Sequence, residues 1–368
     1  MANAHEHLLQ YPLGPTLPER GSTLEIAPGV RWLRMGLPFA LDHINLWLLR
    51  DRDDEGREGW TVVDCGIADD ATRAAWESVF AEALEGLPVL RVVVTHMHPD
   101  HIGLAHWLCA RWSEPGHECR MWISATDWGA ARMASATSGS VGGDSAAEFF
   151  ARHGLVDPAS LAAVRERRGY YAHLVPQVPA RMRRLMDGMT LRIGARNWTC
   201  IAGYGHAPEH IALAADGLLI SGDMVLPSIS TNVSVMDFEP ESDPLSLYLS
   251  SIDRYRPLAP DTLVLPSHGR PFRGLHARID QLHAHHEERY AAVLAACAEG
   301  PKCAADLLPV LFRRRLDLHQ TTFAIGEAVA HLHALAASGR LRRLQPEDAE
   351  HGVWRFERVE AGAGVVGN

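Results

Sequence analysis

Residues 90 to 103 read LRVVVTHMHPDHIG, and this stretch decides the fold. Leu90 to Thr95 form a short continuous apolar run, which predicts a strand buried on both faces. Four side chains able to bind a metal follow within six residues: His96, His98, Asp100 and His101. A cluster of this kind at the end of a buried strand is typical of a functional site, because such sites are usually built on the loops that strands lead into.

The spacing of these four side chains suggests two metal-binding points. His96 and His98 are two residues apart, so an extended segment can turn both toward one side. Asp100 and His101 lie beyond the turn and can reach a second point nearby. Imidazole and carboxylate ligands together suit Zn²⁺ or a similar first-row metal.

Further candidate ligands stand at the ends of other predicted strands. His206 lies between two of them, Asp223 closes the segment Ile220-Ser221-Gly222-Asp223, and His268 follows the apolar run at 262–266. Glycines beside these three residues allow tight turns and a close approach to a metal.

Working outward from this cluster, strands and helices alternate over most of the chain. Short β-rich runs predict strands at 30–35, 43–49, 60–64, 121–124, 190–193, 198–202, 211–214, 218–220 and 262–266. Helices are expected at 68–84, 103–112 and 243–255, and residues 126–187 are expected to be mostly helical. After about residue 275, helices at 281–297, 304–312 and 322–337 precede two short strands at 341–344 and 353–356, which suggests a small winged-helix-like unit.

At this point the sequence resembles the metallo-β-lactamase fold superfamily. His96, His98, Asp100 and His101 match its HxHxDH motif, and His206, Asp223 and His268 match its later ligands in order. Asp64-Cys65-Gly66 matches an element that supports the metal-site loop. The resemblance covers roughly residues 24–272.

The resemblance implies an α/β fold, a four-layer αβ/βα sandwich of two facing sheets with helices outside. It divides the chain into a catalytic domain, residues 1–274, with a helical insert at about 131–187, and a C-terminal winged-helix-like domain, residues 275–368. It also implies two Zn²⁺ ions, although Fe or Mn fit similar ligands. One ion would be held by His96, His98 and His206, the other by Asp100, His101 and His268, with Asp223 between them.

The chemistry implied by the resemblance is hydrolysis by a hydroxide shared between the metals, attacking a carbonyl or phosphorus centre. Asp100 would be the catalytic residue that orients the nucleophile or carries its proton, and Asp64 would hydrogen-bond a ligand histidine or its loop. An aspartate at 223 disfavours antibiotic hydrolysis, histidine at 98 disfavours the di-iron flavoprotein branch, and Leu226 disfavours a lactonase.

The nearer match is to glyoxalase II-like proteins and to a related group that carries a C-terminal winged-helix-like unit. A thioester or ester, such as an acyl-CoA-like or glutathione-like substrate, is therefore the leading expectation. A metal-dependent endoribonuclease or phosphodiesterase is the alternative.

The composition of the chain favours some classes of binding partner over others. The net charge of −10 gives no overall attraction to nucleic acid, although arginine clusters at 165–168, 181–184 and 313–315 leave that partner open. Six scattered cysteines without a CxxC pair indicate reduced thiols in a cytoplasmic enzyme. No apolar run is long enough to cross a membrane. A small-molecule substrate is expected, and a homodimer is compatible with the sequence.

Some features allow two interpretations. His210 would touch substrate or make a structural hydrogen bond, and His43 or Asn45 would line the pocket or belong to the core. The histidines at 283, 285 and 286 are interpreted as a solvated helix face. The insert at 131–187, with Phe149 and Phe150, would be a lid with an apolar wall or a packing element.

Overall fold

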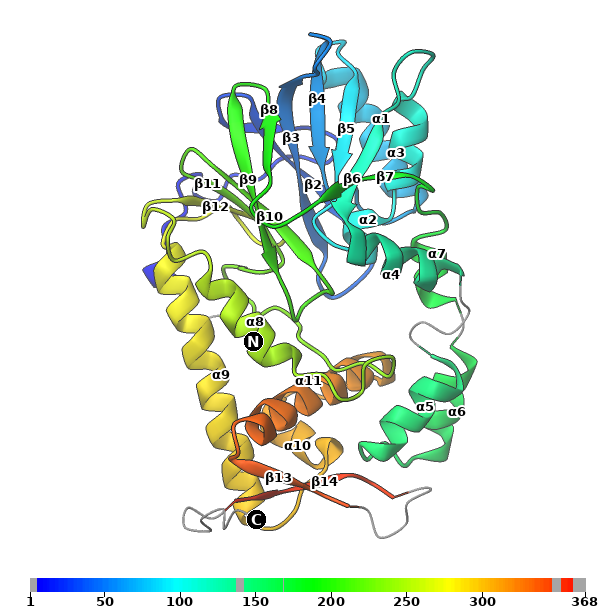
Figure 1. The fold of residues 1–368 in the computed structure, drawn as a ribbon, viewed down its shortest axis with the longest axis vertical. Coiled ribbons are helices and arrows are strands. Elements are labelled where there is room, and N and C mark those ends of the chain that lie inside the picture. The colour runs from blue at the N-terminus through cyan, green and yellow to red at the C-terminus, as the bar shows by residue number, and fades with distance from the viewer. Residues whose placement is uncertain (1–4, 137–141, 168, 346–351, 360–368) are drawn as a thin grey trace. The chain divides into compact units, whose positions relative to one another are not determined.

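The computed structural model describes residues 5–136, 142–167, 169–345 and 352–359. They form two compact units that interleave along the chain (Figure 1). The first comprises residues 1–140, 169–231 and 251–279, and the second comprises residues 141–168, 232–250 and 280–368. The predicted domain boundary after residue 274 stays a prediction. The two units are defined by spatial contact and each contains several separate segments, so they do not test a single boundary along the chain.

The larger sheet of the first unit has seven strands arranged in chain order. They are β1 (Leu24–Ala27), β2 (Val30–Gly36), β3 (His43–Arg52), β4 (Glu58–Val63), β5 (Val89–Val93), β6 (Arg120–Ser124) and β7 (Met182–Leu185). β1 to β4 are antiparallel, and pairing from β4 onward is parallel. The change occurs where helix α1 (Asp70–Glu82) connects β4 to β5, because a parallel pair needs a long crossover.

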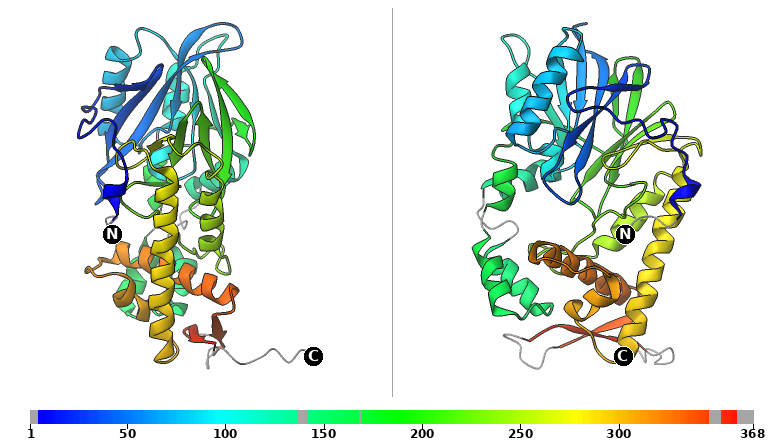
Figure 2. Two further views of the ribbon diagram at one scale, coloured as in Figure 1. Left: turned by 90° about the vertical axis from the view of Figure 1, so that its left-hand side faces the viewer. Right: turned by 180° about the vertical axis from the view of Figure 1, so that it is seen from behind.

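The second sheet has five strands in the order β12-β11-β10-β9-β8. Their bounds are β8 (Thr190–Ile193), β9 (Arg196–Gly203), β10 (His210–Ala215), β11 (Leu218–Gly222) and β12 (Leu263–Pro266). An apolar core joins the two sheets, with Trp32 and Trp47 from the first and Trp198 and Ile211 from the second, all at most 1% exposed. The sheets lie against each other in both views of Figure 2.

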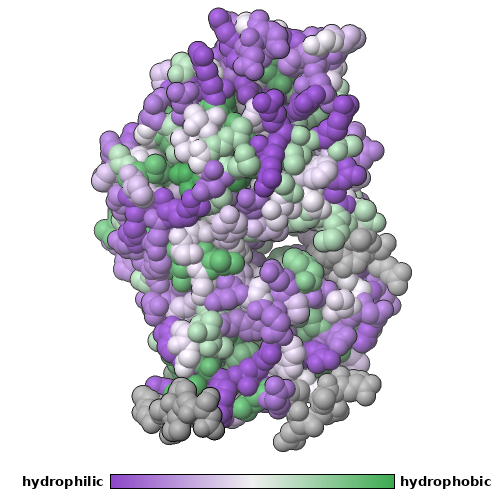
Figure 3. All heavy atoms as spheres, in the orientation of Figure 1, coloured by the Kyte–Doolittle hydropathy of each residue, from purple (hydrophilic) through white to green (hydrophobic). Residues whose placement is uncertain are grey.

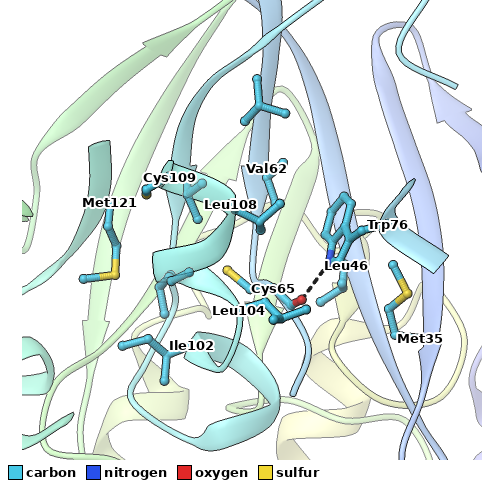
Figure 4. Close-up of a cluster of buried hydrophobic side chains, with 14 of the residues drawn as sticks. Met35, Leu46, Val62, Cys65, Trp76, Ile102, Leu104, Leu108, Cys109 and Met121 are labelled. Atoms are coloured by element: carbon cyan, nitrogen blue, oxygen red, sulfur yellow. Dashed lines mark hydrogen bonds between the residues drawn. The ribbon is translucent and has the colours of Figure 1, made fainter. Parts of the chain in front are cut away.

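The outer face of the larger sheet is covered by α1, α3 (Ala105–Trp112) and α4 (Ala125–Ala136) over a second apolar cluster. Trp76 of α1 is fully buried there and donates from Nε1 to the carbonyl oxygen of Cys65 at 2.8 Å (Figure 4). This contact fixes α1 beside the segment after β4. These layers are those of the predicted αβ/βα sandwich.

The expected helical character of residues 126–187 is wrong at β7. Met182–Leu185 pairs parallel with β6, and the Arg183 guanidinium lies 4.9 Å from the Trp122 ring. Two central arginines hide the apolar alternation that marks a strand, and the pairing with β6 decides the conformation.

The second unit contains α5 (Gly143–Arg152), α6 (Pro158–Glu166), α10 (Ala304–Leu311) and α11 (Leu318–Ala337), followed by the hairpin of β13 (Leu341–Leu344) and β14 (Arg355–Arg358). The C-terminal order of helices and then a hairpin confirms the predicted winged-helix-like unit. The unit boundaries at residues 250 and 279 fall within α8 (Pro244–Asp253) and α9 (Leu275–Ala298).

Two side-chain expectations concern the second unit. Phe149 and Phe150 are buried in the second unit, which agrees with the packing interpretation, and the lid interpretation stays a prediction. His286 is 2% exposed and its Nδ1 lies 3.2 Å from Nε2 of His331 in α11, so the interpretation as a solvated face is wrong for this residue. The helix buries His286 because that position faces α11.

No helix in the described part of the chain is long and apolar enough to cross a membrane. The face shown in Figure 3 carries hydrophilic residues interspersed with smaller apolar patches.

Candidate metal centre

Strand direction brings the predicted ligands to one edge of the sandwich. β10 is antiparallel to both β9 and β11, and β11 is parallel to β12, so the carboxyl ends of β9, β11 and β12 share an edge. His206 follows β9, Asp223 follows β11, and His268 follows β12. The motif after β5 supplies the other four side chains from the facing sheet, at the start of the short helix α2 (Pro99–Ile102).

Three imidazole nitrogens converge at one point. Nε2 of His96 lies 2.9 Å from Nδ1 of His98, which lies 3.0 Å from Nε2 of His206, and the remaining pair of nitrogens is 3.2 Å apart. Hydrogen bonds among neutral imidazoles cannot satisfy a triangle of three ring nitrogens, because each nitrogen is either a donor or an acceptor and at least two of the three must be of the same kind. Lone pairs directed at a common point are what a metal ion requires.

A second group lies next to it. Nε2 of His268 is 3.4 Å from both Asp100 Oδ2 and Asp223 Oδ1, and Nε2 of His101 is 3.4 Å from the same Asp223 oxygen. The other Asp223 oxygen lies 3.3 Å from Nε2 of His206. Asp223 therefore faces both groups, one with each carboxylate oxygen.

The seven predicted residues have the donor chemistry and the spacing that a metal centre needs. The ligand atoms form three groups whose atoms all lie within 4.8 Å of one another: His96, His98 and His206; His96, His101 and Asp223; Asp100, His101 and His268. His101 Nε2 and Asp223 Oδ1 are buried without a hydrogen-bond partner. Such orphaned polar atoms cost free energy unless a further group binds there.

Partners behind the ligands set their tautomers. His101 donates from Nδ1 to Asp64 Oδ2 at 2.8 Å, and His268 donates from Nδ1 to the carbonyl oxygen of His43 at 2.7 Å. Each Nε2 consequently presents its lone pair to the centre. Asp64 also accepts from the backbone N–H of Thr95 at 2.8 Å, which ties the motif to the end of β4. The predicted supporting role of Asp64 is confirmed by this geometry.

Asp127 is a supporting residue that sequence reasoning missed. Its buried carboxylate accepts from the backbone N–H of Met97 at 2.7 Å and from that of Glu209 at 2.6 Å. One side chain thus connects the loop carrying His96 and His98 to the loop carrying His206. Burial raises the pKa of Asp127 to about 6, against the opposing effect of its hydrogen bonds.

His210 has neither of its predicted roles. It is fully buried, and neither ring nitrogen has a protein hydrogen-bond partner. The ring packs 5.0 Å from the His96 ring and against Gly222, where an added Cβ would meet Nε2 at 2.0 Å. His210 therefore packs between the His96 ring and the backbone of Gly222.

His43 and Asn45 support the His268 turn. Asn45 is buried and donates from Nδ2 to the carbonyl oxygens of Pro266 at 2.8 Å and Gly269 at 3.0 Å. The Nε2 atom of His43 accepts from the backbone N–H of Gly269 at 2.9 Å, and the residue also lines a cavity. The core interpretation therefore holds for Asn45, whereas a substrate-pocket role of His43 stays a prediction.

Burial and neighbouring charges shift the pKa values of the candidate ligand histidines in opposite directions in the two groups. Burial lowers the pKa of His98 to about 3 and that of His96 well below its usual value, so both rings are neutral at neutral pH, as metal ligands must be. Burial alone would lower the pKa of His268, but Asp223 and Asp100 raise it to about 10. Burial likewise opposes ionisation of Asp100, yet His101 and His268 lower its pKa to about 2. The negative charges of Asp223 and Asp100 thus favour the protonated form of His268 when no cation is bound.

Comparison with known proteins agrees with this geometry. Residues 40–268 match the model of the metallo-β-lactamase superfamily, and residues 290–359 match that of the metallo-β-lactamase-like C-terminal domain. The chain belongs to the metallo-β-lactamase superfamily. The first match contains all seven predicted ligands, and the second covers most of the helices and hairpin at the C-terminus.

Relatives extend over nearly the whole chain. A structure described as a β-lactamase domain protein from Burkholderia ambifaria is 56% identical, covers 97% of this chain and 100% of its own, and has a TM-score of 0.90. A metallo-β-lactamase family protein from Thermus thermophilus is 28% identical over 91% of this chain and 100% of its own, with a TM-score of 0.69. The curated protein YqjP of Bacillus subtilis (strain 168), a probable metallo-hydrolase, is 25% identical over 83% of this chain and 91% of its own. These similarities support a metallo-hydrolase with a His/Asp metal site.

Proposed function

We propose that this metallo-β-lactamase-superfamily chain is a binuclear hydrolase that cleaves a thioester or ester carbonyl, of an acyl-CoA-like or glutathione-like substrate. The carrying observation is the position of Asp223, whose two oxygens face two separate groups of ligand nitrogens at 3.3 and 3.4 Å. One carboxylate shared in this way suits a pair of closely spaced cations.

The residues would divide between the two ions. His96, His98 and His206 would hold one, Asp100, His101 and His268 would hold the other, and Asp223 would contact both. Zinc is the default metal for such a set of imidazoles and carboxylates, and iron or manganese would also fit. Bound divalent ions would supply a low-pKa water and polarise the substrate carbonyl.

Asp100 is the residue proposed to handle the proton. Its side chain is 19% exposed, whereas those of His101 and His268 are at most 2% exposed, so Asp100 is the acid of the second group that faces solvent and substrate. An ionised Oδ oxygen there can orient the attacking water, accept its proton and return it to the departing thiolate. The low pKa of Asp100 keeps the carboxylate ionised at neutral pH.

Context supports a small-molecule substrate and a reducing compartment. The chain carries a net charge of −10, and all six cysteines are free and buried. A cytoplasmic location is part of the proposal, as is a homodimer as the alternative to a monomer.

A phosphodiesterase acting on RNA is the second candidate. Arg313, Arg314 and Arg315 form an exposed basic run next to α10, which suits phosphate contacts. Arg181, Arg183 and Arg184 are also exposed, although Arg181 lies 3.6 Å from Glu118. Arg167 donates to Thr322 Oγ1 at 3.3 Å, and Arg168 lies outside the described residues.

Thiol release tests the proposal. Zinc-loaded protein is assayed with matched acyl-CoA and acyl-glutathione thioesters, and His98→Ala serves as the ligand variant. His173→Ala is the matched control, because His173 is exposed and lies outside the ligand set. The proposal expects release by the wild type and by the control, and loss of about 10²-fold or more in His98→Ala. Cleavage of RNA without any thioester hydrolysis would replace the proposal with the second candidate.

A further inference from the structure

A cavity of about 240 Å³ lies directly beside the His268 turn in the first unit. Its lining includes two arginines, Arg34 and Arg270, one acid, Glu6, and the uncharged or weakly basic residues Tyr11, His43, Ser228 and Gly269. Gly269 follows the ligand His268, and Ser228 lies five residues after Asp223, so two segments that carry ligands also form this wall. The His43 ring lies 6.1 Å from the His268 ring, which places the cavity next to the metal centre.

Arg34 contributes a positive charge, and its guanidinium hydrogen-bonds to neutral acceptors. This half-buried residue of β2 donates from Nε to Asn45 Oδ1 at 3.2 Å and from Nη2 to the carbonyl oxygen of Gly269 at 2.7 Å. Both acceptors are neutral. Within the described part of the chain, no carboxylate oxygen lies within 4.0 Å of its guanidinium.

Arg270 places a second guanidinium at the same cavity. Its Nη1 donates to the carbonyl oxygen of Gly14 at 2.9 Å, and its charge lies 4.0 Å from the Tyr11 ring centroid. Glu6 also lines the cavity, and its Oε1 lies 4.0 Å from Nη2 of Arg270 while it accepts a hydrogen bond from the Tyr11 hydroxyl at 2.5 Å. One acid therefore faces two guanidinium groups, which leaves the cavity with an excess of positive charge. Burial is the largest effect on Arg34 and lowers its pKa, while the charge of Asp42 raises it. The positive charge of Arg270 lowers the pKa of Arg34 further, because the two cations repel each other.

Asp42 and His43 are the other ionisable groups beside Arg34. Asp42 is 83% exposed and pairs with Nδ1 of His43 at 2.6 Å, on the side facing solvent. His43 accepts at Nε2 from the backbone of Gly269, so it supports the turn and offers no free acceptor to the cavity. Two guanidinium groups facing one cavity are stabilised when an anion lies between them, because bidentate contacts to carboxylate or phosphate satisfy their donors.

We infer that this cavity is a subsite in which Arg34 and Arg270 bind an anionic group of the substrate, a carboxylate or a phosphate, while the scissile carbonyl lies at the adjacent metal centre. The inference rests on the proposed hydrolase function and adds to it a substrate class, anionic thioesters or esters. Neutral esters of the same acyl group would lack this contact.

Matched substrates test the subsite. One acyl group is presented on glutathione, which carries carboxylates, on CoA, which carries phosphates, and on neutral N-acetylcysteamine. The selectivity is the ratio of kcat/KM for each anionic thioester to that for the neutral one. Arg34→Gln and Arg270→Gln are each expected to lower this ratio about tenfold or more, mainly through KM, since each removes a charged hydrogen-bond donor. The carrier that loses more identifies the anion.

Control variants separate this effect from structural damage. Arg192→Gln removes an exposed arginine of β8 that forms no ion pair in the described structure, and it should keep the wild-type ratio. Arg34→Lys should recover part of the selectivity. Because Arg34 also holds the Gly269 carbonyl, metal content is measured for each variant, and Arg270→Gln decides if Arg34→Gln does not fold.

Calorimetric binding of inorganic phosphate and of succinate to the zinc-loaded protein tests the cavity without turnover. Weaker binding of either anion by at least about tenfold in the arginine variants supports the subsite even if no thioester is hydrolysed, in which case only the proposed function fails. Hydrolysis without preference for anionic thioesters, or equal preference and equal anion binding in wild type and both arginine variants, would overturn the subsite and leave the hydrolase intact.

Discussion

His101 donates a hydrogen bond from Nδ1 to the carboxylate of Asp64 at 2.8 Å, and neither side chain is more than 1% exposed. Asp64 adopts a positive φ of 61°, a left-handed conformation that aspartate and asparagine tolerate better than most residues. The same carboxylate also accepts from the backbone and the hydroxyl of Thr95. The end of β4 thereby fixes both the ring orientation and the loop position of a proposed ligand.

Asp64→Asn should weaken zinc binding about 10–100-fold, because the amide keeps the backbone conformation but loses the charged acceptor for His101. Chelator competition measures the dissociation constant. Asp51→Asn is the matched control: Asp51 is also buried and accepts from Thr61 and Arg91, but it lies at the end of β3 opposite to His43. The control should lower Tm and leave zinc affinity unchanged, and equal zinc losses in both variants would argue against a specific role of Asp64.

Asp127→Asn should loosen the connection between the two ligand loops. A carboxylate accepts from both Met97 and Glu209 through separate oxygens, whereas an amide offers one acceptor and places a donor against the other N–H. We expect a destabilisation of about 1–3 kcal/mol and weaker binding at the site of His98 and His206. Denaturant unfolding and metal titration measure the two effects. Unchanged stability in this variant would contradict the proposed link.

Metal binding should release protons and strengthen as pH rises. Asp223 and Asp100 raise the pKa of His268 to about 10, so without metal this ring is protonated at neutral pH, whereas a ligand must be neutral. The proton must leave when the ion binds, and the apparent affinity for the second ion should rise up to about tenfold per pH unit between pH 7 and 9. Calorimetry in buffers of different ionisation enthalpy counts the protons. No proton release would contradict this assignment.

Gly222→Ala should destabilise the protein more than Gly217→Ala. Both glycines have positive φ, 52° and 75°, so both substitutions carry a left-handed backbone cost of about 1–2 kcal/mol. Only the Cβ at 222 would collide with His210, at 2.0 Å, while the Cβ at 217 meets no atom within 4 Å. We expect a further loss of about 1–3 kcal/mol at 222, measured by denaturant unfolding. Equal losses would mean that His210 moves freely.

The candidate ligands could be predicted from the sequence in more detail than the residues that hold them in place. The motif from His96 to His101 is local, and each later candidate ligand follows a strand that its apolar run identifies, so the structure brings all seven together. Asp127 carries no local signal, because its partners Met97 and Glu209 are distant along the chain. The predictions for His286 and β7 were wrong for a related reason. Contacts with α11 bury His286 and pairing with β6 makes residues 182–185 a strand, and neither contact is visible in the local sequence pattern.

Metal content per chain tests the central claim most directly. Protein reconstituted with zinc and freed of excess metal is analysed for the wild type, His206→Ala, His268→Ala and the His173→Ala control. A binuclear centre predicts about two equivalents in the wild type and the control, and about one in each ligand variant, since the substitutions remove ligands of different ions. One equivalent or less in the wild type, or the same content in all four proteins, would contradict the account.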